Sequence, residues 1–223
     1  MKNLTLIIPA KNEKESLPIV LKELKNKNYK IKIIVNRNDI TTINSVSKFR
    51  CDIIFQDKKG YGNALLKGIK SLKTDFFCIF NADGSFNPKE IPNMIKIIKL
   101  KNYDFVFASR YEKKCGSEDD TIITILGNFI FTQLGRFFFK VPITDILYTF
   151  VIGKTNKIKK LKLKQNDFSF CVELPIKAKQ KGMKLTTSKS FERKRIAGKK
   201  KVNAFRDGFL ILTYMIKLFL KNE

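Results

Sequence analysis

The sequence predicts a single α/β domain with a mostly parallel sheet and helices on both of its faces. Strand-length apolar runs alternate with amphipathic helical stretches through the first half of the chain, which is the pattern of such sheets. The 223 residues, 43% of them hydrophobic, are enough for one full core. No repeat or low-complexity segment interrupts the alternation. We expect residues 1–201 to form this domain and residues 202–223 to add an amphipathic helix.

Five strands and three helices are predicted in the first half. The strand-length apolar runs are 4–9, 31–35, 52–55, 76–80 and 104–108. Helices are expected at about 15–25, from Gly60 to about Leu72, and after Pro88, because proline is favoured in the first turn of a helix.

The second half is less regular. Residues 121–152 are unusually apolar, a helix is expected at 173–181, and a strand at 185–191. The densest basic run of the chain, 192–201, follows. Beyond it, apolar residues recur at spacings of 3 or 4 as far as Phe219, which predicts one apolar helix face. This helix is too short to cross a bilayer, so it either lies in a membrane interface or packs on the domain.

The chain is strongly basic, with a net charge of +25 from 38 lysines, seven arginines and 20 acidic residues. Arginine, which recognises phosphates and bases in a planar fork, is scarce, so the charge fits an anionic membrane surface or a polyanionic ligand at least as well as nucleic acid. The four cysteines have no CxxC spacing, and the chain has no histidine. The sequence therefore argues against the usual zinc sites. The chain starts on a strand, and no apolar run reaches the roughly 18 residues of a membrane span. We therefore expect a cytoplasmic protein.

The segment 80–85 is the most informative, because it places Asp83 just past the buried strand 76–80. Parallel α/β sheets bind ligands at the carboxyl ends of their strands. A carboxylate there suits a divalent cation that also binds phosphate oxygens. The alternative is a solvated turn, since Asp-Gly pairs are common in turns.

Further short motifs occur at 7–13, 59–69, 108–111, 143–145 and 195–201. In this order, together with 80–88, they resemble glycosyltransferase family 2, and within it the polyprenyl-phosphate (dolichyl-phosphate mannosyl- or glucosyl-) transferase branch. The resemblance covers about residues 4–202. It implies a GT-A, Rossmann-like catalytic domain over 1–201. The implied reaction is inverting transfer of a hexose from a nucleotide-diphospho-sugar to a polyprenyl phosphate at the cytoplasmic membrane face.

The resemblance also implies a donor site. Glu13 would accept hydrogen bonds from the base or ribose, although a carboxylate in the first turn of a helix is the simpler alternative. Gly60 and Gly62 would let the backbone approach a phosphate, or form a plain tight turn. The implied donor-binding residues are Pro9, Lys11, Glu13, Val35, Gly60, Gly62, Ala82 and Asp83.

A Mg²⁺ or Mn²⁺ ion is implied at Asp83, with Asn81 and Ser85 beside it. Asp83 matches the last aspartate of the family's Asp-x-Asp motif, whereas Asn81 replaces the first and offers only a neutral oxygen. The ion would neutralise the leaving nucleoside diphosphate.

Arg110, Arg195 and Lys201 match family positions that bind the acceptor phosphate. Such an acceptor is already anionic and needs no strong general base. Asp83, Arg110, Arg195 and Lys201 are therefore the expected catalytic residues, and a solvated basic loop is the alternative for 192–201. Asp145 matches a structural or site-lining aspartate.

Three departures from the family pattern keep other functions open. Lys11 replaces a tyrosine, 36–39 replaces an Asp-Asp-Gly-Ser loop, and the acidic 118–120 occupies a region where relatives carry an acceptor-binding arginine. The alternatives are transfer to another glycan or lipid-linked acceptor, a nucleotide-sugar-binding pseudoenzyme, and, as the least favoured, a basic nucleic-acid-binding protein. We expect no nucleic acid partner and a peripheral association with the membrane surface.

Overall fold

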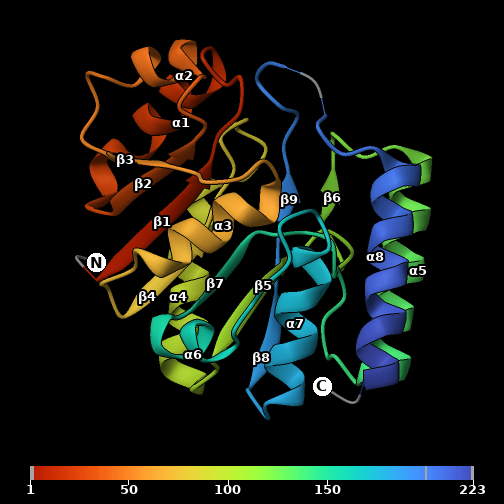
Figure 1. The fold of residues 1–223 in the computed structure, drawn as a ribbon. Coiled ribbons are helices and arrows are strands. Elements are labelled where there is room, and N and C mark those ends of the chain that lie inside the picture. Colours follow the sequence, from red (N-terminus) through yellow and green to blue (C-terminus); the bar gives the residue numbers. More distant parts are fainter. Residues whose placement is uncertain (1–2, 199, 222–223) are drawn as a thin grey trace.

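The structure is a computed structural model that describes residues 3–198 and 200–221 (Figure 1). Within these residues one large sheet has the strand order β3-β2-β1-β4-β7-β5-β8. Its strands are β1 (Leu4–Pro9), β2 (Lys30–Val35), β3 (Asp52–Phe55), β4 (Phe76–Ile79), β5 (Phe105–Ser109), β7 (Val151–Lys154) and β8 (Leu185–Lys189). Only β7 runs antiparallel to its neighbours, β4 and β5. The prediction of a mostly parallel sheet is confirmed.

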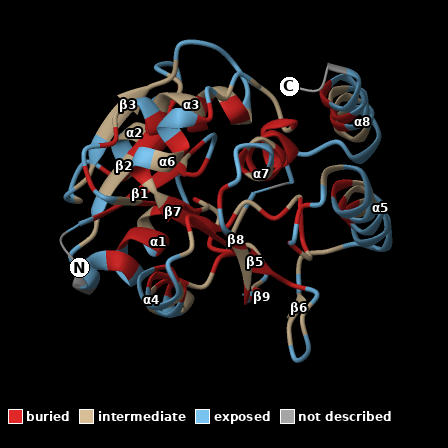
Figure 2. Ribbon diagram, turned by 90° about the horizontal axis from the view of Figure 1, so that it is seen from below, coloured by how far each residue is buried: buried red, intermediate tan, exposed pale blue. Residues whose placement is uncertain are grey.

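Helices cover both faces of this sheet, as predicted (Figure 2). One face packs against α1 (Ser16–Leu24), α2 (Ile40–Ser45) and α4 (Ile91–Lys101). The other face packs against α3 (Tyr61–Lys70), α6 (Thr155–Lys160) and α7 (Phe170–Gln180). Two long helices, α5 (Ile122–Phe139) and α8 (Ala204–Lys221), lie side by side beyond α7. The remaining elements are the 3-10 helices η1 (Lys25–Lys27) and η2 (Pro88–Glu90) and a two-stranded parallel sheet of β6 (Gly116–Ser117) and β9 (Phe191–Glu192).

The central strands are buried on both faces, which explains their unbroken apolar runs. In β1, Ile7 belongs to the core beneath α3 and α7, whereas Leu6 and Ile8 belong to the core beneath α1 and α4. Successive side chains of a strand point to opposite faces, so an apolar residue is needed at each position.

The sequence did not predict β7, which lies inside the apolar segment 121–152. A Cβ on Gly153 would lie 2.4 Å from Phe105 Cδ1, so glycine permits this strand to pair beside β5. The same segment contains α5, an 18-residue helix that is long and apolar enough to cross a membrane, although 17% of it is buried against the domain. The prediction that no segment reaches this length was therefore wrong.

The predicted C-terminal helix is α8, and residues 222–223 of that prediction lie outside the described residues. Its side chains Ile211, Met215 and Leu218 are buried in the main core. The helix thus packs on the domain along one face, which was one of the two alternatives left open by the sequence.

Candidate active site

The predicted site lies at the carboxyl ends of β1, β4 and β5, and a basic segment covers it. We call residues 193–201 the strap; Lys199, part of the predicted basic run, lies outside the described residues. The Arg193 amide donates to the Ser85 carbonyl at 2.9 Å, and the Ile196 amide donates to the Asp83 carbonyl at 2.8 Å. A Cβ on Gly84 would lie 2.4 Å from Ile196 Cδ1. The strap is therefore held against the loop that carries Asp83.

The cations of the strap contact the carboxylates of the predicted donor and metal site. A terminal nitrogen of the Arg195 guanidinium lies 2.9 Å from Asp119 Oδ2 and 3.5 Å from Asp83 Oδ2. Burial lowers the pKa of Arg195, but its hydrogen bond to Asp119 and the charge of Asp83 outweigh this effect and raise it. Lys201 Nζ pairs with Glu13 Oε1. The structure thus brings together four of the predicted residues from three distant parts of the chain.

Glu13 is almost fully buried, just before α1. Its Oε2 accepts a hydrogen bond from Ser16 Oγ at 2.5 Å, while its backbone amide donates to Thr42 Oγ1 at 2.9 Å. The carboxylate is therefore fixed in place before any ligand binds, with Lys201 as its counter-ion. Glu13 lies three residues before α1 begins at Ser16, so the alternative of a carboxylate in the first turn of the helix is wrong, and its role in donor binding stays a prediction.

Little space remains under the strap. The cavity lined by Asn12 to Ser16 and by Ala197 and Gly198 has a volume of about 100 Å³. Small-molecule sites usually measure roughly 300–1,000 Å³. The space between the strap and Glu13 is thus smaller than an ordinary small-molecule site.

The residues predicted to hold a metal form one small oxygen-rich cluster. The Ser85 amide donates to Asp83 Oδ1 at 3.0 Å, and Asn81 Nδ2 donates to Ser85 Oγ at 3.1 Å. Within residues 3–198 and 200–221, no group of three or more His, Cys, Asp or Glu side chains could hold a metal. A single carboxylate with neutral oxygens nevertheless fits Mg²⁺, which proteins often bind through one or two carboxylates and the phosphates of a substrate.

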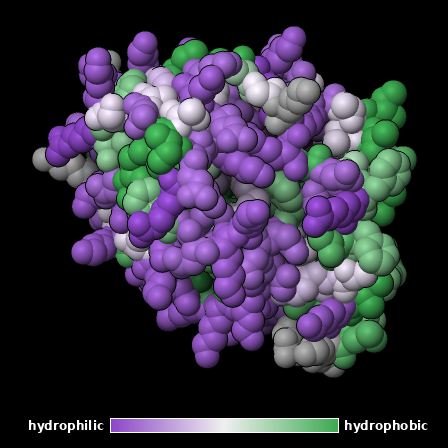
Figure 3. All heavy atoms as spheres, turned by 45° about the horizontal axis from the view of Figure 1, so that its top comes forward, coloured by the Kyte–Doolittle hydropathy of each residue, from purple (hydrophilic) through white to green (hydrophobic). Residues whose placement is uncertain are grey.

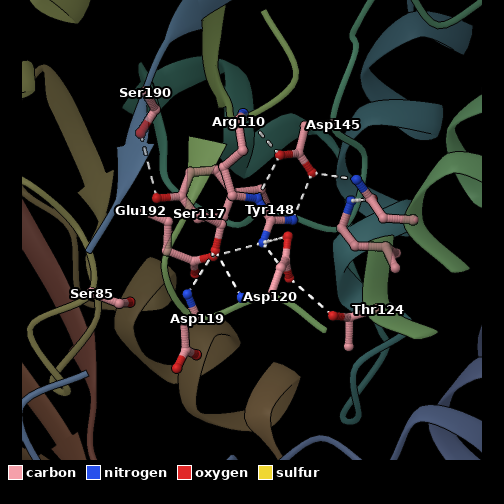
Figure 4. Close-up of polar contacts among 12 residues, drawn as sticks. Ser85, Arg110, Ser117, Asp119, Asp120, Thr124, Asp145, Tyr148, Ser190 and Glu192 are labelled. Atoms are coloured by element: carbon pink, nitrogen blue, oxygen red, sulfur yellow. Dashed lines mark hydrogen bonds and ion pairs between the residues drawn. The ribbon is translucent and has the colours of Figure 1, made fainter. Parts of the chain in front are cut away.

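Arg110 is engaged in a buried ion-pair network, which we call the Arg110 hub (Figure 4). Its Nε and one terminal nitrogen donate to Asp145 at 2.8 and 3.0 Å. The other terminal nitrogen donates to Asp120 at 3.1 Å and to Glu192 at 2.8 Å. Four of the five N–H groups of the guanidinium thus already have carboxylate partners. The structure does not support the prediction that Arg110 binds the acceptor phosphate, because its donors are committed to these carboxylates.

Three carboxylates surround this single guanidinium, so the hub has surplus negative charge. Burial raises the pKa of Glu192, and the nearby charge of Arg110 and a hydrogen bond from Ser117 only partly offset that effect. Asn128 of α5 donates to Asp145 at 2.7 Å, so the network also fixes this helix. Asp119 points away from the hub, toward the strap (Figure 4). The hub therefore ties together β5, β9, α5 and the segment before α5.

Gly60 and Gly62 lie against the protein's own backbone, and their contact with a ligand stays a prediction. A Cβ on Gly60 would lie 2.1 Å from the Asn166 carbonyl oxygen. A Cβ on Gly62 would lie 2.2 Å from the Gln165 carbonyl oxygen. Gly60 also has a φ of +126°, which side chains other than glycine rarely adopt. The close approach is thus to the protein backbone of 165–167.

The other predicted donor residues differ in their access to a ligand. Val35 and Ala82 are buried among the core side chains beneath α1 and α4, and their part in donor binding stays a prediction. Pro9 is only partly buried and Lys11 is exposed, and both lie at the same sheet edge as Asp83.

Two aspartates beside the candidate site, Asp119 and Asp39, were not among the predicted residues. Asp119 lies between Arg195 and Lys200, and the sequence marked it only as part of an unusual acidic segment. Asp39 accepts hydrogen bonds from the Asn12 amide at 2.7 Å and the Thr42 amide at 3.2 Å. Burial raises the pKa of Asp39, but these hydrogen bonds outweigh that effect and lower it. The altered 36–39 loop thus retains an aspartate that holds the loop after β1.

The fold is that of an α/β protein with a mostly parallel sheet, and carboxylates and cations meet at the edge where such sheets bind ligands. The chain belongs to glycosyl transferase family 2, whose sequence pattern matches residues 5–162. The class is thus glycosyltransferase, and the predicted GT-A, Rossmann-like fold is confirmed.

The relatives found by sequence include an uncharacterized protein and a named glycosyltransferase. The chain is 28% identical over 188 residues to an uncharacterized protein of Methanocaldococcus jannaschii, covering 81% of this chain and 77% of the relative. It is 30% identical over 118 residues to dolichol-phosphate mannosyltransferase of Pyrococcus furiosus, covering 49% of this chain and 33% of that protein.

Solved structures resemble the fold over almost the whole chain. Mannosyl-3-phosphoglycerate synthase from Rubrobacter xylanophilus has a TM-score of 0.75 at 12% identity, covering 99% of this chain and 74% of that one. Glucosyl-3-phosphoglycerate synthase from Mycobacterium tuberculosis, in complex with Mn²⁺, uridine diphosphate and glucosyl-3-phosphoglycerate, has a TM-score of 0.72 at 10% identity, covering 96% and 79%. The same synthase was also solved with Mg²⁺ and uridine diphosphate. Structures of this fold thus bind the ions that the sequence predicts.

Proposed function

We propose that this protein transfers a hexose from a nucleotide-diphospho-sugar to a polyprenyl phosphate, with inversion, at the cytoplasmic face of a membrane. The family supports glycosyl transfer, and the dolichol-phosphate mannosyltransferase relative supports a polyprenyl phosphate as the acceptor. One observation carries the proposal: Arg195 and Lys201 contact the carboxylates of the donor site, immediately before the apolar helix α8.

The charged groups of the site suit the diphosphate of the donor first and the phosphate of the acceptor second. Asp83, Asn81 and Ser85 would hold a Mg²⁺ or Mn²⁺ ion, which when bound neutralises the diphosphate of the donor. When this divalent ion lies beside Asp83, it replaces Arg195 as the counter-ion of the Asp83 carboxylate. Arg195 then becomes available to bind phosphate oxygens in a charge-assisted fork.

The reaction needs no general base in this arrangement. A phosphate oxygen of the acceptor attacks the anomeric carbon of the sugar and forms the new carbon–oxygen bond. The bond from that carbon to the diphosphate breaks on the opposite face, and the nucleoside diphosphate leaves with the electron pair. Arg195 and Lys201 hold the acceptor phosphate and orient it for this attack.

Donor binding requires the strap to move, since the cavity beside Glu13 holds only about 100 Å³. The strap is held by ion pairs at Asp83, Asp119 and Glu13 and by two backbone hydrogen bonds. Gly198, at φ +80°, is a position where the backbone can change direction. We propose that the metal and the donor replace these ion pairs and displace the strap.

A phosphoglycerate acceptor is the second candidate, because structures of two such synthases share the fold. Its phosphate would bind the same cations, but a hydroxyl group would attack the sugar. Asp119, which pairs with Arg195 of the strap, is a carboxylate that could accept the proton of this hydroxyl group.

Calorimetry with a panel of nucleotide sugars, with and without Mn²⁺, identifies the donor. Transfer is then measured to a short polyprenyl phosphate and to 3-phosphoglycerate in parallel. Product from the polyprenyl phosphate alone supports the proposal. Product from 3-phosphoglycerate alone would show that phosphoglycerate is the acceptor instead. Donor binding without transfer to either would identify a nucleotide-sugar-binding pseudoenzyme. Binding of oligonucleotides instead, with an affinity that falls steeply with salt, would overturn the assignment.

A further inference from the structure

Helix α5 has its polar and apolar faces in the reverse of the usual order. The residues that it buries against the domain are Asn128, Thr132 and Gly135. Asn128 bonds to Asp145 and to the Leu147 amide, and Thr132 accepts from the Ile146 amide at 3.2 Å. Most of its large apolar side chains instead face outward, whereas Phe131, Leu134 and Phe139 are partly buried against the core. A helix on a soluble domain normally buries its apolar stripe and exposes its polar one.

Helix α8 lies parallel to α5 and extends the same apolar surface. Phe138 and Phe219 form an edge-on ring pair near the ends of the two helices, with centroids 5.2 Å apart, and Phe131 approaches Gly208 near the start of α8. Beside its buried stripe, α8 has an exposed one. We call the combined surface the α5/α8 face, made up of Ile122, Ile123, Ile125, Leu126, Phe129, Ile130, Phe137, Phe138, Phe205, Phe209, Leu212, Ile216, Phe219 and Leu220.

The α5/α8 face stands out from the rest of the visible surface. Figure 3 shows hydrophobic side chains concentrated along the edge formed by these helices, beside a mostly hydrophilic surface. Ile122 is 85% exposed and Phe205 is 82% exposed. Contiguous apolar surface of this kind marks an interaction site, because monomeric proteins rarely leave it in water.

Cations border this apolar surface. Arg136, Lys140 and Lys217 are exposed on or beside the two helices. Arg136 and Lys140 also line an open hollow of about 610 Å³ at the end of α5, together with Gln133, Leu134, Phe137 and Phe138. Phosphate headgroups above a hydrocarbon layer have the complementary pattern of charge and apolar surface.

We infer that the α5/α8 face lies flat in the interface of an anionic lipid bilayer, with its apolar side chains among the acyl chains and Arg136 and Lys140 at the headgroups. The inference deepens the proposed function and rests on it in part, because a polyprenyl phosphate acceptor resides in a bilayer. Both helices begin beside the site: Asp120 of the Arg110 hub precedes α5, and Lys201 of the strap precedes α8. A bilayer on this face therefore meets the domain at the acceptor side.

Charge favours a bilayer over a second copy of this chain on the α5/α8 face, and hydrogen bonding favours α5 lying in the interface over α5 spanning the membrane. Two copies of this chain, each with a net charge of +25 and with Arg136 and Lys140 on the same surface, would repel one another across such a contact. Although α5 is long enough to span, its Asn128 and Thr132 are bonded to the domain through Asp145 and Ile146. A spanning α5 would have to break these bonds, whereas a helix lying in the interface keeps them.

Flotation of the full chain with phosphatidylglycerol-containing vesicles tests the inference, with phosphatidylcholine vesicles for comparison. The wild type should float with the anionic vesicles at low salt, and less with neutral ones. Phe129→Glu with Phe209→Glu should weaken binding by about tenfold to a hundredfold for each lost aromatic anchor. Leu100→Glu, at an exposed apolar position of α4, is the matched control and should bind as wild type does.

The cations are tested separately. Arg136→Ala and Lys140→Ala should each weaken binding to anionic vesicles by about fivefold, while binding to neutral vesicles stays the same. Lys22→Ala, an exposed lysine of α1, is the control and should change neither. Urea unfolding of each variant confirms that it is folded.

Two outcomes would overturn the inference. One is a wild type that stays in solution beside anionic vesicles at low salt. The other is a wild type that sediments as a dimer which the Phe129 and Phe209 variants convert to monomer, because the face would then join two copies. Transfer to a short, water-soluble polyprenyl phosphate, measured without vesicles, separates this inference from the proposed function. Vesicle binding without transfer would support the membrane role of the α5/α8 face and would contradict the proposed reaction.

Discussion

Arg110 and Arg195 were predicted to hold the same acceptor phosphate, yet the structure gives them opposite surroundings. The Arg110 side chain is 8% exposed and has three carboxylate partners in the hub. The Arg195 side chain is 18% exposed and has two, Asp119 and Asp83. Of the two, only Arg195 has a partner, Asp83, that the metal of the proposed function would take over.

The difference shows that an arginine can bind a substrate phosphate only if another cation can replace it beside its carboxylate partners. The carboxylate side chains of the hub are largely buried, and among the described residues Arg110 is the cation that pairs with all three of them, so releasing Arg110 would leave their charge uncompensated. Asp83 and Glu13 lie at the open sheet edge, where a metal and a donor could satisfy them instead. The ion pairs of the hub are thus permanent, whereas those of the strap can be exchanged for a ligand.

Removing Asp83 should have the largest effect. Asp83→Ala should abolish turnover and metal-dependent donor binding, because it removes the only carboxylate of the 81–85 motif. Asn81→Asp should preserve or tighten metal affinity, since it adds a second carboxylate. Calorimetry with Mn²⁺ and the donor, alongside turnover, measures both. If Asp83→Ala binds metal and donor as wild type does, the metal is held elsewhere.

Arg110→Met should destabilise the fold by about 3–5 kcal/mol, because it leaves buried carboxylates without their cation. Arg195→Met should cost no more than about 1 kcal/mol, because its ion pairs are nearer the solvent. Urea unfolding compares the two, with Arg206→Met, an exposed arginine of α8, as control. A stable Arg110→Met protein that has lost transfer alone would restore the role that the sequence predicted and remove the contrast between the two arginines.

Arg195 should also restrain metal binding before the donor arrives. Arg195→Ala frees Asp83 of its neighbouring cation, so the affinity for Mn²⁺ alone should rise by about fivefold or less, as expected for loss of a partly exposed ion pair. Titration with Mn²⁺ monitored by electron paramagnetic resonance measures this change, and Arg193→Ala, whose guanidinium pairs with Glu23, is the matched control. Weaker Mn²⁺ binding by Arg195→Ala would show that this arginine supports the metal site rather than competing with it.

The smallest effect is the pH dependence of the hub. The pKa of Glu192 is raised in the folded protein, chiefly by burial, above its ordinary value of 4.5. As pH rises through the ordinary value, Glu192 of the unfolded chain loses its proton first, so folding stability falls until the folded group has ionised as well. Glu192→Gln should remove this loss. Urea unfolding from about pH 4 to about pH 8 tests the sign: a wild type that gains stability relative to the variant over this range would contradict it.

The fold was predictable because most of its strands are regular. Strand β1, at 4–9, lies where the apolar run placed it, since a parallel strand buried on both faces must be almost wholly apolar. Strand β7 was not predictable, because its antiparallel insertion between β4 and β5 depends on long-range pairing and on the absence of a side chain at Gly153.

The site was predictable in its components and less so in their partners. The motifs identified Glu13, Asp83, Arg195 and Lys201, and the structure brings them to one sheet edge. The true partners of Arg110 come from residues 10 to 82 positions away along the chain, so no local pattern reveals them. Gly60 and Gly62 show the same limit: the sequence indicates a close approach, but only the fold shows that the backbone of 165–167 is what approaches.

Single-turnover transfer to a short polyprenyl phosphate, with donor affinity measured alongside, tests most directly that the strap binds the acceptor phosphate. Arg195→Ala and Lys201→Ala should each lower transfer by about tenfold to a hundredfold, the cost of a lost charge-assisted hydrogen bond, and leave donor affinity largely intact. Arg195→Lys should not fully restore transfer, because lysine lacks the planar fork. If both alanine variants transfer as wild type does, or lose donor binding in equal measure, the strap does not hold the acceptor phosphate.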